Sequence, residues 1–311
     1  MTNSISTTTY EPELEPVPKP KRISPFVRRV KATSVRIQQR DIEILQALYS
    51  YRLLTTSQLT RMFFTTKRRA EQRLRQLFDA ELVERIFRPV VVGRAEIIYV
   101  LDNNGVSLLA SETGRDRGEV NEARTKAKKL KPFFLDHFIE VNQFRLSATL
   151  ACSSKDVDFL FWKYAHELQN RNKKGVLISD RVVDPENTGE KIPITPDGFL
   201  GLVTPQGRAY YFVEVDRGTM DNPRFLRKMR GYARYWLDDV FTEKWGYSAF
   251  RVLTSTTTKR RVENLLKTTN RLNEKKLLSI FHFTEQENIT PEQIFSDIWQ
   301  LPNREGRNSL L

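Results

Sequence analysis

Apolar residues recur at helical spacing from about residue 40 to residue 80. Between Asp41 and Tyr51 they form a single core-facing stripe made of Ile42, Leu45, Leu48 and Tyr49. Thr55 and Gln58 then have the spacing of a capping box, which predicts that a second, short helix starts there. After a brief turn, a third helix is expected from about Thr66 to Ala80.

The third predicted helix has two chemically different faces. Its apolar face carries Ala70, Leu74, Leu77 and Phe78. The opposite face carries guanidinium and carboxamide groups, from Arg68, Arg69, Gln72, Arg75 and Gln76. Arginine pairs with guanine edges and phosphates, and glutamine pairs with adenine, so this face is typical of a DNA recognition helix.

Two strand-like runs follow, at residues 82–86 and 96–101, and the turn between them has basic flanks at Arg88 and Arg94. Three helices and a hairpin in this order predict a winged helix-turn-helix. Two alternatives remain open at this point. The basic helix face could be a solvated surface, and winged helices also serve as protein-docking modules.

The second half of the chain alternates between helices and strands. A helix containing Glu140 is expected after Lys131, and a second helix is expected from about Asn222 to Leu237, with Phe225, Met229, Tyr232 and Trp236 buried. The expected strands are 158–162, 194–203, 210–216 and 249–255, followed by a basic helix at 259–272 and a strand-like run at 278–283. The central order is therefore αβββαβ, in a chain of mixed α+β or α/β class.

Three carboxylates stand at the ends of the predicted strands. Asp197 follows a proline, and Glu214 and Asp216 lie two residues apart, which places them on one face of a strand. Carboxylates brought together in this way repel one another unless protons or a cation offset their charge. An oxygen-ligand site for Mg²⁺ or Mn²⁺ is therefore expected.

Composition narrows the functional classes further. The 311 residues include 51 Lys and Arg against 38 Asp and Glu, a formal net charge of +13, which favours a polyanionic partner such as nucleic acid. The single cysteine excludes an internal disulfide and a cysteine-based zinc site, and no phosphate-binding loop signature is present. No apolar run approaches the roughly 18 residues of a membrane span, and no secretory signal is visible. We therefore expect a cytoplasmic protein associated with plasmid or nucleoid DNA.

The αβββαβ order with Pro196-Asp197 and then Glu214 resembles the PD-(D/E)xK nuclease fold. The resemblance implies that Asp197 and Glu214 hold Mg²⁺, with Glu140 as a further carboxylate from the first helix. In that family a lysine two residues after the glutamate supports the attacking water, but here Asp216 occupies the position. Asp216 is then a metal ligand or base, and Lys228 on the following helix is the candidate for the missing amine. A degenerate nuclease fold kept for binding or dimerisation is the alternative.

The two halves together resemble the replication-relaxation family over roughly Arg40 to Ser255. The resemblance is carried by text such as RDIEILQALYSYRLLTTSQLTRMFF and FVEVDRGT with an upstream PDGF. It implies a sequence-specific double-stranded DNA-binding protein of a plasmid or integrating element, acting in replication control or DNA mobilisation. Two alternatives are a metal-dependent endonuclease or nickase, and a non-catalytic assembly factor that forms a homodimer or binds a replication or mobilisation protein.

These expectations divide the chain into five segments. They are a disordered basic arm at 1–38, a winged helix at 39–111, a linker at 112–131, a nuclease-like domain at 132–300 and a tail at 301–311. A helical extension of the winged helix is the alternative for the linker segment.

Overall fold

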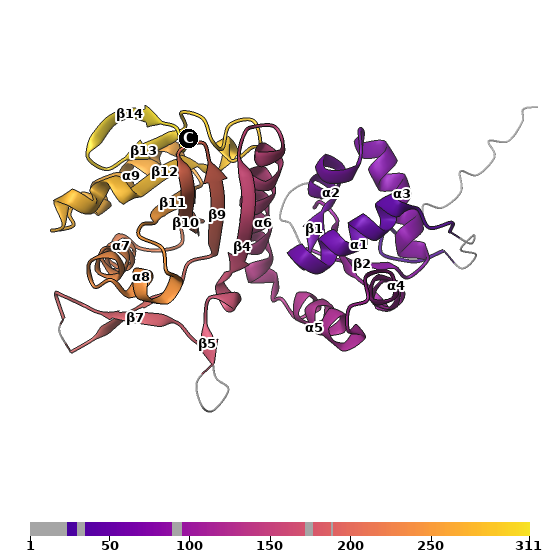
Figure 1. Ribbon diagram of the computed structural model, residues 1–311. Coiled ribbons are helices and arrows are strands. Elements are labelled where there is room, and N and C mark those ends of the chain that lie inside the picture. Colours follow the sequence, from indigo (N-terminus) through magenta and orange to yellow (C-terminus); the bar gives the residue numbers. More distant parts are fainter. Residues whose placement is uncertain (1–23, 30–34, 89–94, 172–176, 188) are drawn as a thin grey trace, which may run out of the picture.

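The computed structural model describes residues 24–29, 35–88, 95–171, 177–187 and 189–311. The chain is a mixed α+β protein, in which one group of helices packs around a small sheet and a second group packs around a larger sheet (Figure 1). Among the described helices, none combines the length and the apolar character that a bilayer crossing requires.

The N-terminal unit contains the three predicted helices and a small antiparallel sheet. Its first elements are α1 (Gln39–Tyr51), β1 (Leu54–Thr55), α2 (Thr56–Phe63), α3 (Lys67–Asp79), β2 (Val83–Ile86) and β3 (Ile98–Leu101). In the sheet, β3 lies between β1 and β2 and runs antiparallel to both. The apolar face of α3 is buried as predicted, because Ala70, Leu74, Leu77 and Phe78 pack into one core.

Local chemistry explains where these helices begin and how they are held. The Thr55 side chain accepts a hydrogen bond from the Gln58 backbone N–H and the Gln58 side chain accepts one from the Thr55 backbone, so the predicted capping box is confirmed. Arg73 of α3 forms a two-pronged ion pair with Asp41 of α1, and Arg73 Nε lies 2.9 Å from Asp41 Oδ1. Asp41 is fully buried, so this pair fixes α3 against α1.

The segment expected to be a linker is helical and packed, as in the alternative of a helical extension. It contains the end of α4 (Asn103–Thr113) and α5 (Arg117–Lys128). Val120 and Ala127 are fully buried, and α5 packs against α1, α4 and β3. The N-terminal unit therefore extends to Lys128, and burial of these two side chains is the physical reason for the difference.

The C-terminal unit is built on a mixed seven-stranded sheet. Its strands are β4 (Asp158–Tyr164), β9 (Gly198–Thr204), β10 (Gly207–Asp216), β11 (Arg251–Thr256), β12 (Phe281–Glu285), β13 (Trp299–Leu301) and β14 (Arg304–Asn308). The spatial order is β14-β13-β12-β11-β10-β9-β4, with β10, β11 and β12 parallel and the remaining neighbours antiparallel. The tail expected at 301–311 is thus partly a strand of this sheet, and Leu310 is buried.

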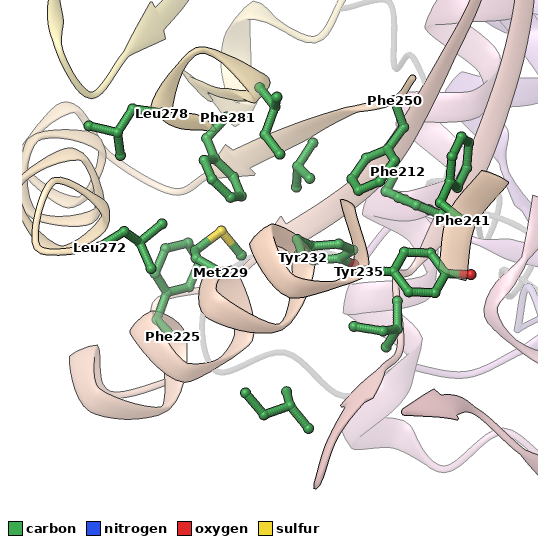
Figure 2. Close-up of a cluster of buried hydrophobic side chains, with 14 of the residues drawn as sticks. Phe212, Phe225, Met229, Tyr232, Tyr235, Phe241, Phe250, Leu272, Leu278 and Phe281 are labelled. Atoms are coloured by element: carbon green, nitrogen blue, oxygen red, sulfur yellow. The ribbon is translucent and has the colours of Figure 1, made fainter. Parts of the chain in front are cut away.

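Helices cover both faces of the large sheet. The main helices are α6 (Pro132–Ser153), α7 (Asn222–Leu237), α8 (Val240–Trp245) and α9 (Lys259–Thr269), with 3-10 turns η2 (Lys275–Ile280) and η3 (Gln286–Asn288) before and after β12. The cluster in Figure 2 shows α7 directing Phe225, Met229 and Tyr232 toward the sheet. Tyr235 is fully buried there, whereas Trp236, which was predicted to be buried, is only partly covered. On the opposite face, α6 and the segment around Trp299 form a separate core.

An inserted segment between β4 and β9 was not predicted. It consists of η1 (Ala165–Glu167), β5 (Asn170–Arg171), β6 (Leu177–Ile178), β7 (Asp180–Val183) and β8 (Lys191–Ile194). The β7–β8 hairpin packs on α7 at Gly231, where an added Cβ would lie only 2.7 Å from Ile192 Cγ2. The predicted strand 194–203 therefore falls on two strands, β8 and β9, with residues 195–197 between them.

Helix α6 belongs to both units. Its Leu146 packs into the N-terminal core, while Phe144 and Ala148 pack under the large sheet. Asn142 is fully buried and donates hydrogen bonds to the backbone oxygens of Tyr51 (3.1 Å) and Leu53 (2.7 Å). The hydroxyl of Tyr164, at the end of β4, donates to Asn142 Oδ1 at 2.7 Å. One side chain thus connects the two units.

Candidate functional site

The polar face of α3 is a cationic surface on the N-terminal unit. Arg68, Arg69, Gln72 and Gln76 are exposed, as is Lys67 at the start of the helix. Thr66 caps α3, and Arg69 Nη1 donates to Thr65 Oγ1 at 3.3 Å. Gln76 accepts a hydrogen bond of 2.8 Å from Arg73. Most of the predicted face is therefore open to a partner.

Arg75 differs from the other residues predicted on this face. Its guanidinium pairs with Asp79 at 2.9 Å and donates to the backbone oxygen of Val27 at 2.7 Å. Only 15 % of its side chain is exposed, because residues 24–29 cover this end of α3. Arg28 adds to this contact through ion pairs with Glu84 and Asp102.

Of the two hairpin residues predicted to bind DNA, only Arg88 lies in the described part of the chain. Arg88, just after β2, pairs with Asp136 in the first turns of α6. Arg217, after β10, pairs with the other oxygen of Asp136 at 3.1 Å. Arg94 lies outside the described residues.

A pocket of about 250 Å³ opens where α6, the start of β9 and the end of β10 meet. Asp197, Glu214, Asp216 and Lys228, which are the four predicted catalytic residues, all line it. The apolar part of the lining comes from Phe133, Phe134, Val215, Met220 and Phe225. The structure therefore brings these four predicted residues together in one cavity.

Glu214 is the most buried carboxyl of the pocket. It accepts hydrogen bonds from the Lys228 ammonium and the Tyr232 hydroxyl, both on α7. Burial raises the pKa of Glu214 to about 7, with the charge of Asp197 adding to the effect and Lys228 opposing it. Burial alone would lower the pKa of Lys228, but the charges of Glu214 and Asp197 raise it above its ordinary value. Lys228 therefore stays protonated while it holds Glu214.

Asp197 has its own partners. Its Oδ1 lies 3.0 Å from His137 Nε2, and its Oδ2 accepts a hydrogen bond of 2.8 Å from the Val215 backbone. Burial alone would raise the pKa of Asp197, yet the hydrogen bond from His137 and the charge of Lys228 lower it. Burial alone would lower the pKa of His137. The hydrogen bond to Asp197 and the charges of Asp197, Glu214 and Glu140 instead raise it above its ordinary value. His137 was missed as a site residue; its position three residues before Glu140 on one helix was the available signal.

The two remaining predicted carboxylates are engaged elsewhere. Asp216 accepts hydrogen bonds from Arg261 of α9 (2.9 and 3.2 Å) and from Thr256 (2.6 Å). Glu140 pairs with Arg217 at 3.4 Å and does not line the pocket. Burial raises the pKa of Glu140, and Arg217 opposes this.

The donor set can be tested against the expected Mg²⁺ or Mn²⁺. Among the residues that the structure describes, no three His, Cys, Asp or Glu side chains form a group able to hold a metal ion. Glu140 and Asp216 are paired with arginines, so Asp197 and Glu214 are the pocket carboxylates that could hold a cation. Mg²⁺ is usually held by one or two carboxylates together with waters and substrate phosphates.

Comparison with known proteins identifies the family. The model of the replication-relaxation family matches residues 45–249, which is more than half of the chain and spans the α3 surface and the pocket residues up to Lys228. Neither the curated proteins nor the solved structures contain a match. The resemblance found in the sequence is confirmed, and the chain belongs to the replication-relaxation family.

Proposed function

We propose that this chain binds double-stranded DNA of a plasmid or integrating element and acts in its replication control or mobilisation, with residues 39–111 forming a winged helix. The exposed Arg and Gln side chains of α3 are the observation that carries the proposal. The order α1-β1-α2-α3-β2-β3 and the β1-β3-β2 sheet support the proposal, because a winged helix has this order of elements, with the third helix as its recognition helix and the hairpin as its wing. The net charge of +13 agrees with a polyanionic ligand.

The test is duplex binding by a variant with Arg68→Ala and Arg69→Ala. We expect its affinity for a DNA duplex that the wild type binds to fall by at least tenfold, since a base contact from arginine contributes about 1–3 kcal/mol. The salt dependence of binding should also become shallower. Arg208→Ala with Arg304→Ala is the matched control, because both residues are exposed on the large sheet and the charge change is equal. Equal affinity of the two double variants would remove α3 as the DNA-contacting element.

A second function, metal-dependent DNA cleavage, is favoured by one observation. Asp197, Glu214 and Lys228 meet in a single pocket at the end of β10, where the resemblance to PD-(D/E)xK nucleases requires two carboxylates and an amine. In this proposal Asp197 and Glu214 would hold Mg²⁺ or Mn²⁺, which when bound would polarise a phosphate and activate water. Lys228 would hold Glu214 in place and supply positive charge, while Asp216, tied to Arg261, has a structural role.

Incubation of supercoiled plasmid with the full-length chain and Mg²⁺ or Mn²⁺ tests cleavage. We expect nicking that disappears in Asp197→Asn and Lys228→Met but persists in Asp158→Asn, which changes an exposed aspartate on β4. Intact plasmid with either metal, despite retained DNA binding, would contradict cleavage. That outcome would favour the non-catalytic assembly factor, for which the mass of the particle in light scattering would report a homodimer.

A further inference from the structure

Two adjacent phenylalanines stand exposed at the mouth of the pocket. Phe133 is 75 % exposed and Phe134 is 52 % exposed, although both line the same cavity as Asp197 and Glu214. Their rings meet edge to face with centroids 5.5 Å apart. They lie in the first turn of α6, after Pro132, and the buried Leu135 anchors that turn. The aromatic pair therefore stands at an anchored helix start with much of its ring surface open to a partner.

Basic residues lie close to this aromatic pair in the sequence. Lys128, Lys129 and Lys131 precede it in the chain and are exposed. Asp136, one turn further along α6, is shared between Arg88 and Arg217. The acidic groups of the site have basic partners, since His137 faces Asp197, Lys228 faces Glu214 and Arg261 faces Asp216. The entrance therefore presents cations and aromatic rings together.

We infer that Phe133 and Phe134 form a stacking platform for unpaired bases, so that the pocket receives a single-stranded DNA segment. Aromatic rings beside lysines and arginines suit single strands, because each unpaired base offers a ring face and each phosphate a negative charge. Bases within a duplex are already stacked and cannot use such a platform. The inference rests on the proposed function, which supplies DNA as the ligand. It adds that the DNA at the pocket is single-stranded.

The ion pairs around Asp136 place the platform beside the proposed duplex-binding surface. Arg88 follows β2, at the base of the hairpin proposed as the wing, and it contacts the same short stretch of α6 that carries the two phenylalanines. A duplex lying against the hairpin would thus end, or open, close to the aromatic pair. DNA with a junction between double and single strands is the ligand that satisfies both surfaces.

The experiment compares binding of the full-length chain to a duplex, to the same duplex with a single-stranded tail, and to the tail alone. Phe133→Ala with Phe134→Ala is expected to weaken binding of both tailed and single-stranded DNA by about 5- to 150-fold for each base that stacks, with duplex affinity retained. Phe133→Tyr should retain tail binding, whereas Phe133→Leu should lose it. Fluorescence of 2-aminopurine in the tail should be quenched by the wild type and not by the double alanine variant.

Leu237→Ala is the control, since Leu237 is also an exposed apolar residue but lies at the end of α7. Equal losses for duplex and tailed DNA, or no loss for either, would overturn the platform. A change in oligomeric mass without a change in tail binding would also overturn it, because it would assign the phenylalanines to a protein contact. If the α3 variant binds duplex normally while the phenylalanine variant loses the tail, the platform stands and the recognition-helix proposal fails.

Discussion

At the scale of single residues, Glu214 is the group whose protonation is most altered by the fold. Its pKa is raised to about 7 by burial and by the nearby charge of Asp197. The folded chain therefore binds this proton more tightly than the unfolded chain, whose glutamate titrates near 4.5. The contribution of Glu214 to the free energy of unfolding should fall as pH rises from about 4.5 to 7, and should be level above that range.

Glu214→Gln tests this linkage, because a glutamine can still accept the hydrogen bond from Tyr232 but does not titrate. As pH rises from 5 to 8, the wild type should lose the contribution of Glu214 and the variant should not. The free energy of unfolding of the variant minus that of the wild type should therefore increase by up to about 3 kcal/mol over this range. Urea unfolding at both pH values measures the difference. The exposed Glu243→Gln is the control, and a wild-type-minus-variant difference that is the same at both pH values would contradict the assignment.

The residues of the pocket differ in how far sequence could predict them. Asp197 and Glu214 follow a recognisable spacing, and Lys228 lies on the helix that the apolar stripe predicts, so these three were found. The ion pair between Asp216 and Arg261 could not be predicted, because Arg261 is distant in sequence and reaches Asp216 only through the packing of α9. His137 was missed although its position, three residues before Glu140 on the same helix, could have indicated it.

At the scale of elements, the orientation of α3 depends on the buried pair between Arg73 and Asp41. Arg73→Met should destabilise the chain by about 3–5 kcal/mol, since it leaves the fully buried Asp41 carboxylate without its charged partner. Chemical denaturation monitored by circular dichroism measures this loss. Arg69→Met, on the exposed face of the same helix, should change stability by less than about 0.5 kcal/mol. Similar losses in the two variants would show that the pair does not fix the helix.

Elements with a strong periodic pattern were predicted well, and weakly apolar ones were not. The bounds of α7 agree with the predicted helix at both ends, and α1 and α3 differ only at their ends. Helix α5 was expected to be a linker because only Val120 and Ala127 are buried along it, too few to form a visible stripe. The β7–β8 hairpin was missed because its strands are short and their packing against α7 is a tertiary effect.

At the scale of the whole molecule, α6 decides whether the two units act together. The proposed duplex surface lies on the N-terminal unit and the pocket lies on the C-terminal unit, so a DNA junction engages both only if α6 holds them in a constant relation. Asn142 is the fully buried polar link in this contact, through Tyr51 and Leu53 on one side and Tyr164 on the other, and Arg145 adds a more exposed one between Ser50 and Tyr164. Cooperative unfolding of the whole chain is the expected consequence.

Asn142→Leu tests this coupling. Leucine fills a similar volume but removes three hydrogen bonds. The Tyr51 oxygen still accepts from the Leu53 backbone and the Tyr164 hydroxyl still accepts from Arg145, so the main cost, about 1–3 kcal/mol, comes from the Leu53 oxygen that loses the Asn142 donor. We expect the single thermal transition of the wild type in calorimetry to become two, with the N-terminal unit melting first because it has the smaller core. Gln143→Leu is the control, since Gln143 bonds only within α6 and to Ile289 of the C-terminal unit. One unchanged transition in Asn142→Leu would mean that the other contacts between the units are sufficient to couple them, among them the packing of Leu146, the hydrogen bonds from Arg145 to Ser50 and the Arg61–Glu292 ion pair.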